Sequence, residues 1–169
     1  PILSKFGKNS VAYSSTIMQI FLLYLAFNLL STNTSHVEMI SIAPPLGISF
    51  VLNQASLFFV ALFAFLITMF SLYYLTHRKT HAYEKETKFC ILLNMLLASS
   101  IGLVLSSDIF NIYVFFERAG ISAYILSAYK KTPTALEEGL KYLLTGAVAS
   151  VFLIFAIALI YINLGSLNL

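Results

Sequence analysis

Long apolar runs alternate with short polar segments along the whole chain. Runs long enough to cross about 30 Å of hydrocarbon predict five spans, at residues 11–31, 51–76, 89–106, 109–129 and 140–162. Each run is apolar on all sides. A soluble amphipathic helix would be apolar along one stripe, and a membrane-barrel strand at every second residue. The pattern therefore predicts an all-α membrane protein with five transmembrane helices.

Composition supports this prediction and excludes other classes. Of 169 residues, 59% are hydrophobic and 10% are charged, whereas a soluble domain carries about 25% charged residues. A soluble enzyme and a nucleic-acid-binding protein are therefore excluded. The single cysteine, Cys90, cannot form an internal disulfide. We treat residues 1–169 as one transmembrane domain, and we expect it to be a fragment of a larger helical bundle.

The charged residues are separated from the spans. Only Glu117, Arg118 and Lys141 lie inside them. The other eight lysines and arginines lie before the first span, within residues 77–88 and within residues 130–132, and the alternate connections have none. By the positive-inside rule, loops 77–88 and 130–132 are cytoplasmic, in a multi-pass protein of the cell inner (plasma) membrane. The excess of basic over acidic residues then reflects the topology of the chain and its contact with the lipid bilayer, and nucleic acid is not expected as a partner.

Local signals mark where the last two helices begin. Asp108 is placed to cap the fourth helix, and Thr132 followed by Pro133 is typical of a helix start. The last helix is therefore expected over residues 133–162. Because only residues 107–108 separate the third and fourth spans, we expect those helices to be antiparallel neighbours.

Glu117 is the residue most in need of an explanation. It lies eight residues into a span of 21, and a charge near the bilayer centre costs about 2.5–3.5 kcal/mol. The side chain must be a neutral acid or a carboxylate held by a cation, and a group poised between these states can load and release a proton. The alternative is a structural ion pair that locks two helices together.

Two cations are candidate partners for Glu117. Arg118 points about 100° away on the same helix and does not give up its proton, so it is a tuning or structural residue. Lys141 lies roughly 12 Å deep against roughly 18 Å for Glu117, at 1.5 Å per residue, and a desolvated lysine can exchange a proton. The sequence also allows Lys141 to reach toward the interface or to pair with Glu137 one turn away.

The remaining polar residues indicate supporting roles. Asn94 and Asn111 could hold water or join helices, so we group them with Arg118 as tuning or structural residues. His77 and His81 share a helical spacing without a third ligand, which favours a solvated face and no metal. We find no nucleophile–base pair, phosphate loop or cofactor ligand set, so no cofactor and no catalytic centre are predicted. A pathway for protons or ions remains.

Several motifs carry a family resemblance. Residues 106–117, SSDIFNIYVFFE, resemble the segment G/S-D-L-F-N-L-Y-V-F-F-E of antiporter-like proton-conducting membrane subunits. These subunits occur in Mrp-type antiporters (as the D-type subunit), in respiratory complex I and in energy-converting membrane-bound hydrogenases. Residues 135–150 resemble the next helix of that family, residues 165–168 its closing turn, and residues 43–48, APPLGI, the start of an earlier helix.

The resemblance implies a proton-translocating subunit of a multi-subunit complex, built on inverted repeats with a broken helix. Glu117 takes the place of the family's intramembrane glutamate and Lys141 that of the lysine on the following helix, as proton-relay residues. The implied partners are other membrane subunits and protons, with sodium as an alternative ion. The other candidates are a subunit of a redox-driven pump (NADH:quinone oxidoreductase or membrane-bound hydrogenase), and a structural membrane spacer.

The sequence departs from the family pattern at two positions. Arg118 stands where the family has an apolar residue, and Asn53 stands where an aspartate is common. The family's next lysine and its broken helix are expected beyond Leu169, so this segment would hold only part of a proton path.

Overall fold

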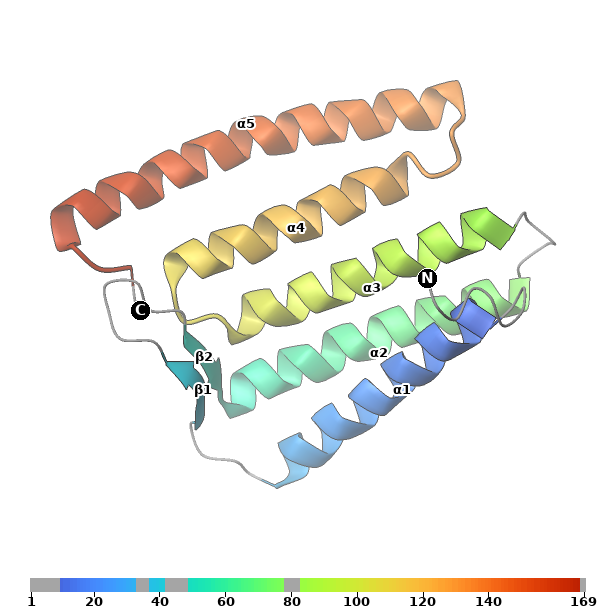
Figure 1. The fold of residues 1–169 in the computed structure, drawn as a ribbon, viewed down its shortest axis with the longest axis horizontal. Coiled ribbons are helices and arrows are strands. Elements are labelled where there is room, and N and C mark those ends of the chain that lie inside the picture. The colour runs from blue at the N-terminus through green and yellow to red at the C-terminus, as the bar shows by residue number, and fades with distance from the viewer. Residues whose placement is uncertain (1–9, 33–36, 42–48, 78–82, 168–169) are drawn as a thin grey trace.

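The computed structural model describes residues 10–32, 37–41, 49–77 and 83–167 (Figure 1). This part of the chain forms five helices and one hairpin: α1 Ser10–Ser31, β1 Val37–Ser41, β2 Ser49–Leu52, α2 Gln54–His77, α3 Tyr83–Leu105, α4 Ile109–Ser127 and α5 Pro133–Leu164. All five helices are long and apolar enough to cross a membrane. The prediction of an all-α membrane fold with five transmembrane helices is confirmed.

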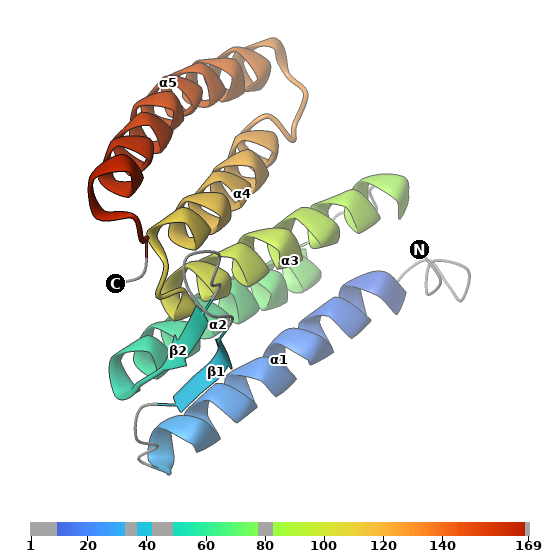
Figure 2. The ribbon, with the colours of Figure 1, turned by 60° about the vertical axis from the view of Figure 1, so that its left-hand side comes forward.

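The helices lie side by side in chain order, from α1 at one edge of the molecule to α5 at the other (Figure 1). Helix α1 packs against α2 and also contacts α3, and α4 lies between α3 and α5. Helices α3 and α4 are antiparallel neighbours, as their short connection predicts, and Figure 2 shows the same order from another side.

The bundle has apolar side chains on the outside and small or polar ones between the helices. Phe27, Phe152 and Ile162 are 67%, 70% and 77% exposed, whereas Gln19 and Ser99 are each 1% exposed. Lipid tails are as apolar as leucine, so membrane helices gain little by burying large apolar residues against each other. They associate through small residues and interhelical hydrogen bonds instead. The distribution of exposed residues is therefore that of a membrane bundle.

Helix α2 begins three residues later than the predicted start at residue 51. Val51 and Leu52 pair with β1 as part of β2. Asn53 then caps the helix: its Oδ1 accepts from the Ser56 backbone N–H at 2.7 Å, and its own N–H donates to Ser56 Oγ at 2.9 Å. Asparagine and aspartate serve equally well in this role, which gives a structural account of Asn53.

The two-stranded hairpin was not predicted from the sequence. Its strands are antiparallel, and Phe50 of β2 forms a bridge with Ser106 at the end of α3. The Ile109 N–H, at the start of α4, donates to the Leu167 carbonyl at 3.0 Å. Both contacts hold the connections around the start of α4. Residues 43–48, which carry the APPLGI resemblance, lie outside the described residues.

The segments that the sequence places on the cytoplasmic side gather at the opposite end of the bundle. The end of α2, the start of α3 and the α4–α5 connection lie together there (Figure 1). Helix α3 begins at Tyr83, before its apolar run, so Lys88 lies inside the helix. Helix α4 ends at Ser127 and α5 at Leu164, against predicted ends at residues 129 and 162. The basic residues 78 and 79 lie outside the described residues.

Candidate functional site

Helix α4 holds Glu117 near the middle of the bundle. The Asp108 carboxylate accepts from the Asn111 backbone N–H at 2.8 Å and caps the helix, as predicted. Glu117 is the ninth of the nineteen residues of α4, which places it about 12 Å from the helix start and about 15 Å from its end. The local capping geometry therefore fixes a carboxyl group close to half the depth of the span.

Glu117 shares a helix face with two tyrosines that reach α5. Tyr113 and Tyr124 lie four residues before and seven residues after it, spacings that repeat on one side of a helix. The Tyr113 hydroxyl lies 3.0 Å from Ser150 Oγ on α5. The Tyr124 ring meets the Tyr142 ring edge-on at 4.6 Å. The α4 face that carries Glu117 is therefore turned toward α5.

A glycine on α5 makes room for the Tyr124 hydroxyl. A Cβ atom at Gly146 would overlap that hydroxyl and the adjoining ring carbon. The hydroxyl thus lies against the α5 backbone, where a larger residue would displace it. Gly146 therefore fixes the position of Tyr124, which lies on the same face of α4 as Glu117.

Glu117 is half-buried and, within the described part of the chain, has no hydrogen-bond or ion-pair partner. Arg118 points elsewhere: its guanidinium lies 5.9 Å from the centre of the Phe115 ring and is exposed. This agrees with the expectation that adjacent helix residues do not face each other. Among the described residues, the midspan carboxyl group is left without a bound cation.

Lys141 is paired with Glu137 on its own helix. Lys141 Nζ lies 2.6 Å from Glu137 Oε1, and the two side chains are 71% and 65% exposed. This is the one-turn alternative weighed from the sequence. The structure therefore does not join Lys141 directly to Glu117. Lys141 lies eight residues into α5, about 12 Å from its start, and so only about 3 Å from the level of Glu117 when both depths are counted from the α4–α5 connection.

A cavity of about 380 Å³ lies between α3, α4 and α5. Its polar lining comes from Tyr124, Tyr142 and Thr145, and the rest of its wall is formed by apolar or small residues of the three helices: Leu96, Phe116, Ala119, Gly120, Ala123, Gly146 and Ala149. The volume would hold several waters, each of which takes about 30 Å³ in the liquid, and the three polar side chains are their possible partners. Glu117 and Lys141 do not line the cavity themselves, but Phe116 and Tyr142, their neighbours in the chain, do.

The other predicted polar residues serve separate contacts. Asn94 Oδ1 accepts from Gln19 Nε2 at 2.8 Å, and Asn94 Nδ2 donates to Ser15 Oγ at 3.0 Å, so Asn94 joins α3 to α1. Asn111 is buried in the first turn of α4. His77 stacks on Tyr73 and lies 2.9 Å from Thr76 Oγ1. His81 lies outside the described residues.

Tyr124, Tyr142 and Gln19 were not predicted as functional residues. For Tyr124 the signal was available, because a spacing of seven residues from Glu117 returns to the same helix face. Tyr142 follows Lys141 directly, but only the packing of α4 on α5 brings it to Tyr124. Gln19 stands in an otherwise apolar stretch, and its partner Asn94 is 75 residues away.

The chain is similar to known membrane proteins along nearly its whole length. Residues 106–169 match the family described as NADH:quinone oxidoreductase/Mrp antiporter, transmembrane. The D-type subunit of a Na(+)/H(+) antiporter of Alkalihalophilus pseudofirmus is 31% identical over 147 residues, which are 87% of this chain and 29% of that protein. The chain thus spans about a third of the length of such relatives.

Solved structures give the same result for the fold. A chain of the membrane-bound sulfane sulfur reductase, an archaeal respiratory membrane complex, superposes with a TM-score of 0.79 at 29% identity, over 99% of this chain and 35% of that one. A chain of the Mrp complex from Dietzia superposes with a TM-score of 0.84 at 20% identity, over 95% of this chain and 31% of that one. The resemblance predicted from the motifs is confirmed. The protein is a multi-pass membrane chain that is similar to antiporter subunits, and its residues 106–169 match the NADH:quinone oxidoreductase/Mrp antiporter transmembrane family.

Proposed function

We propose that this chain forms part of a proton-translocating subunit, in which Glu117 loads and releases the proton. The observation that carries the proposal is the half-buried carboxyl group at midspan with no bound cation in the described part of the chain. Keeping it charged there costs about 2.5–3.5 kcal/mol. A carboxyl group at this depth, with no fixed counter-charge among the described residues, is placed to take up a proton and pass it on.

Lys141 is the proposed second group of the relay. The pair with Glu137 lies within one helix and both side chains are exposed, so no other helix of the described chain holds the lysine amine in place. Lys141 can therefore turn from Glu137 when a negative charge forms on Glu117. In this proposal the pair with Glu137 is the resting position of the lysine.

Tyr124 and water in the adjoining cavity are the proposed link between the two residues. The tyrosine hydroxyl can both donate and accept a hydrogen bond, and Tyr124 lies on the face of α4 that carries Glu117 while its ring meets Tyr142 of α5. Thr145, one turn beyond Lys141, also lines the cavity. A chain of water and hydroxyl groups from Glu117 toward Lys141 would then run between α4 and α5.

The parent assembly and the orientation are also proposals. We place the lysine-bearing end of the bundle on the cytoplasmic side of a bacterial or archaeal plasma membrane, by the positive-inside rule. A cation/proton antiporter is the first candidate, with protons and with sodium as an alternative ion. A redox-driven pump is the second, because the respiratory-complex chain is 29% identical over nearly all of this chain.

The test uses the full-length parent complex in sealed vesicles with a pH-sensitive dye. Glu117→Gln should abolish proton movement while the complex assembles normally. Glu138→Gln is the matched control, because it makes the same chemical change at an exposed position on α5. Normal proton movement in the assembled Glu117→Gln complex would show instead that the carboxyl group is structural, as in a membrane spacer.

A further inference from the structure

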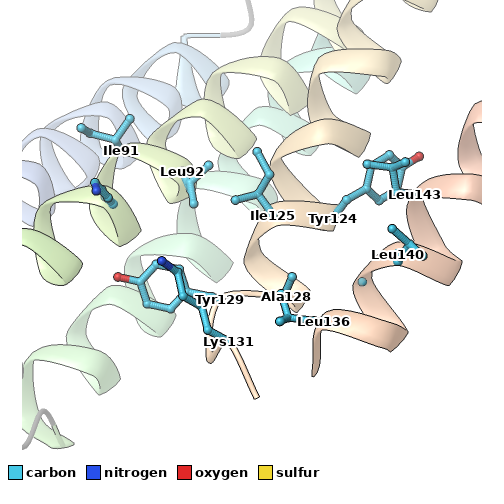
Figure 3. Close-up of a pocket in the computed structure, with 12 residues that line it drawn as sticks. Ile91, Leu92, Tyr124, Ile125, Ala128, Tyr129, Lys131, Leu136, Leu140 and Leu143 are labelled. Carbon is cyan, nitrogen blue, oxygen red and sulfur yellow. The ribbon is translucent and has the colours of Figure 1, made fainter. Parts of the chain in front are cut away.

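A second, larger pocket lies at the lysine-bearing end of the bundle, and Tyr124 is the one lining residue that it shares with the cavity of the proposed proton path. It has a volume of about 570 Å³ and lies between the start of α3, the end of α4 and the start of α5 (Figure 3). This is within the range of ligand-binding pockets, roughly 300–1,000 Å³. It is adjacent to the α4–α5 connection.

The walls of this pocket are apolar and come from all three helices. Ile91 and Leu92 of α3 lie across from Leu136, Leu140 and Leu143 of α5 (Figure 3). At its base, Gly139 brings α5 close to α4, since a Cβ atom there would lie 2.7 Å from the Ala128 Cβ. The walls would shield an alkyl chain from water and offer almost no hydrogen-bonding groups.

The rim, in contrast, is cationic. Lys88 and Lys131 both line the pocket and are exposed. Lys88 is the second residue of the candidate span Thr87–Leu105, and Lys131 lies in the α4–α5 connection, so both are at the level where a membrane meets water. Tyr129, beside Lys131 in Figure 3, is a residue type enriched at that level.

The backbone at Lys131 supports a specific role for this rim. Among the described residues, Lys131 is the non-glycine residue with a positive φ, 54°, a conformation that costs a lysine of the order of 1 kcal/mol or more. Its N–H donates to the Ala128 carbonyl at 3.0 Å. The tight turn thus places the lysine beside the apolar walls at an energetic cost.

We propose that this pocket binds an anionic phospholipid, with an acyl chain between the apolar walls and the phosphate between Lys88 and Lys131. A soluble anion would gain nothing from the leucine and isoleucine walls, and an apolar helix would gain nothing from the two lysines. An anionic amphiphile matches both. Each lysine near an anionic headgroup contributes roughly fivefold to binding, so the loss of both should weaken it roughly tenfold or more.

The test is photo-crosslinking with the full-length complex in vesicles. Phosphatidylglycerol or phosphatidylcholine carrying a photoreactive acyl chain is present at equal mole fraction, and labelled peptides are identified by mass spectrometry. We expect phosphatidylglycerol to label peptides that contain residues 91–92 and 136–143 more strongly than phosphatidylcholine does. The double variant that carries Lys88→Gln and Lys131→Gln should lower this phosphatidylglycerol labelling roughly tenfold or more. It should leave phosphatidylcholine labelling unchanged.

Two further variants decide the interpretation. Lys130→Gln removes the same charge from the adjacent residue, which does not line the pocket. Phosphatidylglycerol should label this variant as strongly as it labels the wild type. Ile91→Trp fills the pocket from an exposed position and should lower labelling by both lipids. The proposal is overturned if the double lysine variant labels normally, or if Lys130→Gln causes the same loss. It is also overturned if neither lipid labels the wild type, because another protein segment then occupies the pocket.

Discussion

Lys141 forms its ion pair with Glu137 on α5, at 2.6 Å, and not with Glu117 on the neighbouring helix. Two charges that could form a relay are therefore separated at rest. Because the pair with Glu137 lies within one helix and is not enclosed by another described helix, Lys141 can respond to a charge that forms on Glu117. The proposed relay requires this responsiveness, and a fixed pair between Glu117 and Lys141 would remove it.

Glu137→Gln should leave proton movement almost unchanged. In the proposed relay Glu137 only holds Lys141 in its resting position, so Lys141 remains available to Glu117 when Glu137 is removed. Lys141→Met, which keeps the apolar stem and removes the charge, should abolish proton movement. Both are measured with a pH-sensitive dye in sealed vesicles. Equal losses in the two variants would mean that the Glu137–Lys141 pair itself is the working unit.

Tyr124→Phe should slow proton movement while the bundle remains folded. The variant keeps the ring contact with Tyr142 and loses only the hydroxyl, and the loss of a hydrogen bond of about 1 kcal/mol corresponds to roughly fivefold in rate. Tyr113→Phe is the matched control. It removes a hydroxyl from the same face, bonded to Ser150, and should lower stability rather than rate. Wild-type rates in Tyr124→Phe would remove Tyr124 from the proposed link.

Gly146→Ala should destabilise the contact between α4 and α5. The added methyl group overlaps the Tyr124 hydroxyl, and overpacking of this kind costs about 1–3 kcal/mol. Combining it with Tyr124→Phe removes the nearest atom of the clash, so the double variant should be more stable than the sum of the single effects predicts. Thermal unfolding in detergent gives the three values. Strict additivity would show that Gly146 does not position Tyr124.

Asn94→Leu should lower stability without affecting proton movement in assembled complexes. The substitution removes two interhelical hydrogen bonds and leaves the buried amide of Gln19 without its partner, at a cost of about 0.6–2 kcal/mol. Asn163→Leu provides the comparison, because Asn163 is exposed and bonds only within α5. Unfolding temperatures distinguish the two. A transport defect in assembled Asn94→Leu complexes would instead place α1 and α3 in the proton path.

The elements of this fold follow from local sequence signals, and the site follows only in part. Apolar runs predicted the five spans, and Asp108 and Thr132 act as helix caps, as expected from their positions. The hairpin was missed because β2, a four-residue strand next to a span, looks like the continuation of that span, and β1 is a short strand of five residues that contains a glutamate. Val51 and Leu52 are as apolar as the helix that follows.

The contacts between side chains of different helices depend on how those helices pack, and one sequence does not reveal that packing. The depth of Lys141 was estimated from residue counts, but counts do not decide whether its amine turns toward Glu137 or Glu117. The contact between Gln19 and Asn94 needs the arrangement of α1 beside α3. Tyr124 could have been found from its spacing to Glu117, whereas its fit against Gly146 depends on how closely α5 approaches.

The most direct test of the central claim is to observe the protonation of Glu117. Loss of transport in a variant reports on the whole path, whereas the carbonyl stretch of a protonated carboxylic acid reports on the group itself. Infrared difference spectra of the full-length complex would be recorded between energised and resting states, for the wild type, Glu117→Gln and Glu138→Gln. We predict a carboxylic-acid band that changes in the wild type and in Glu138→Gln and is missing in Glu117→Gln. The same band in all three proteins would contradict a proton-loading role for Glu117.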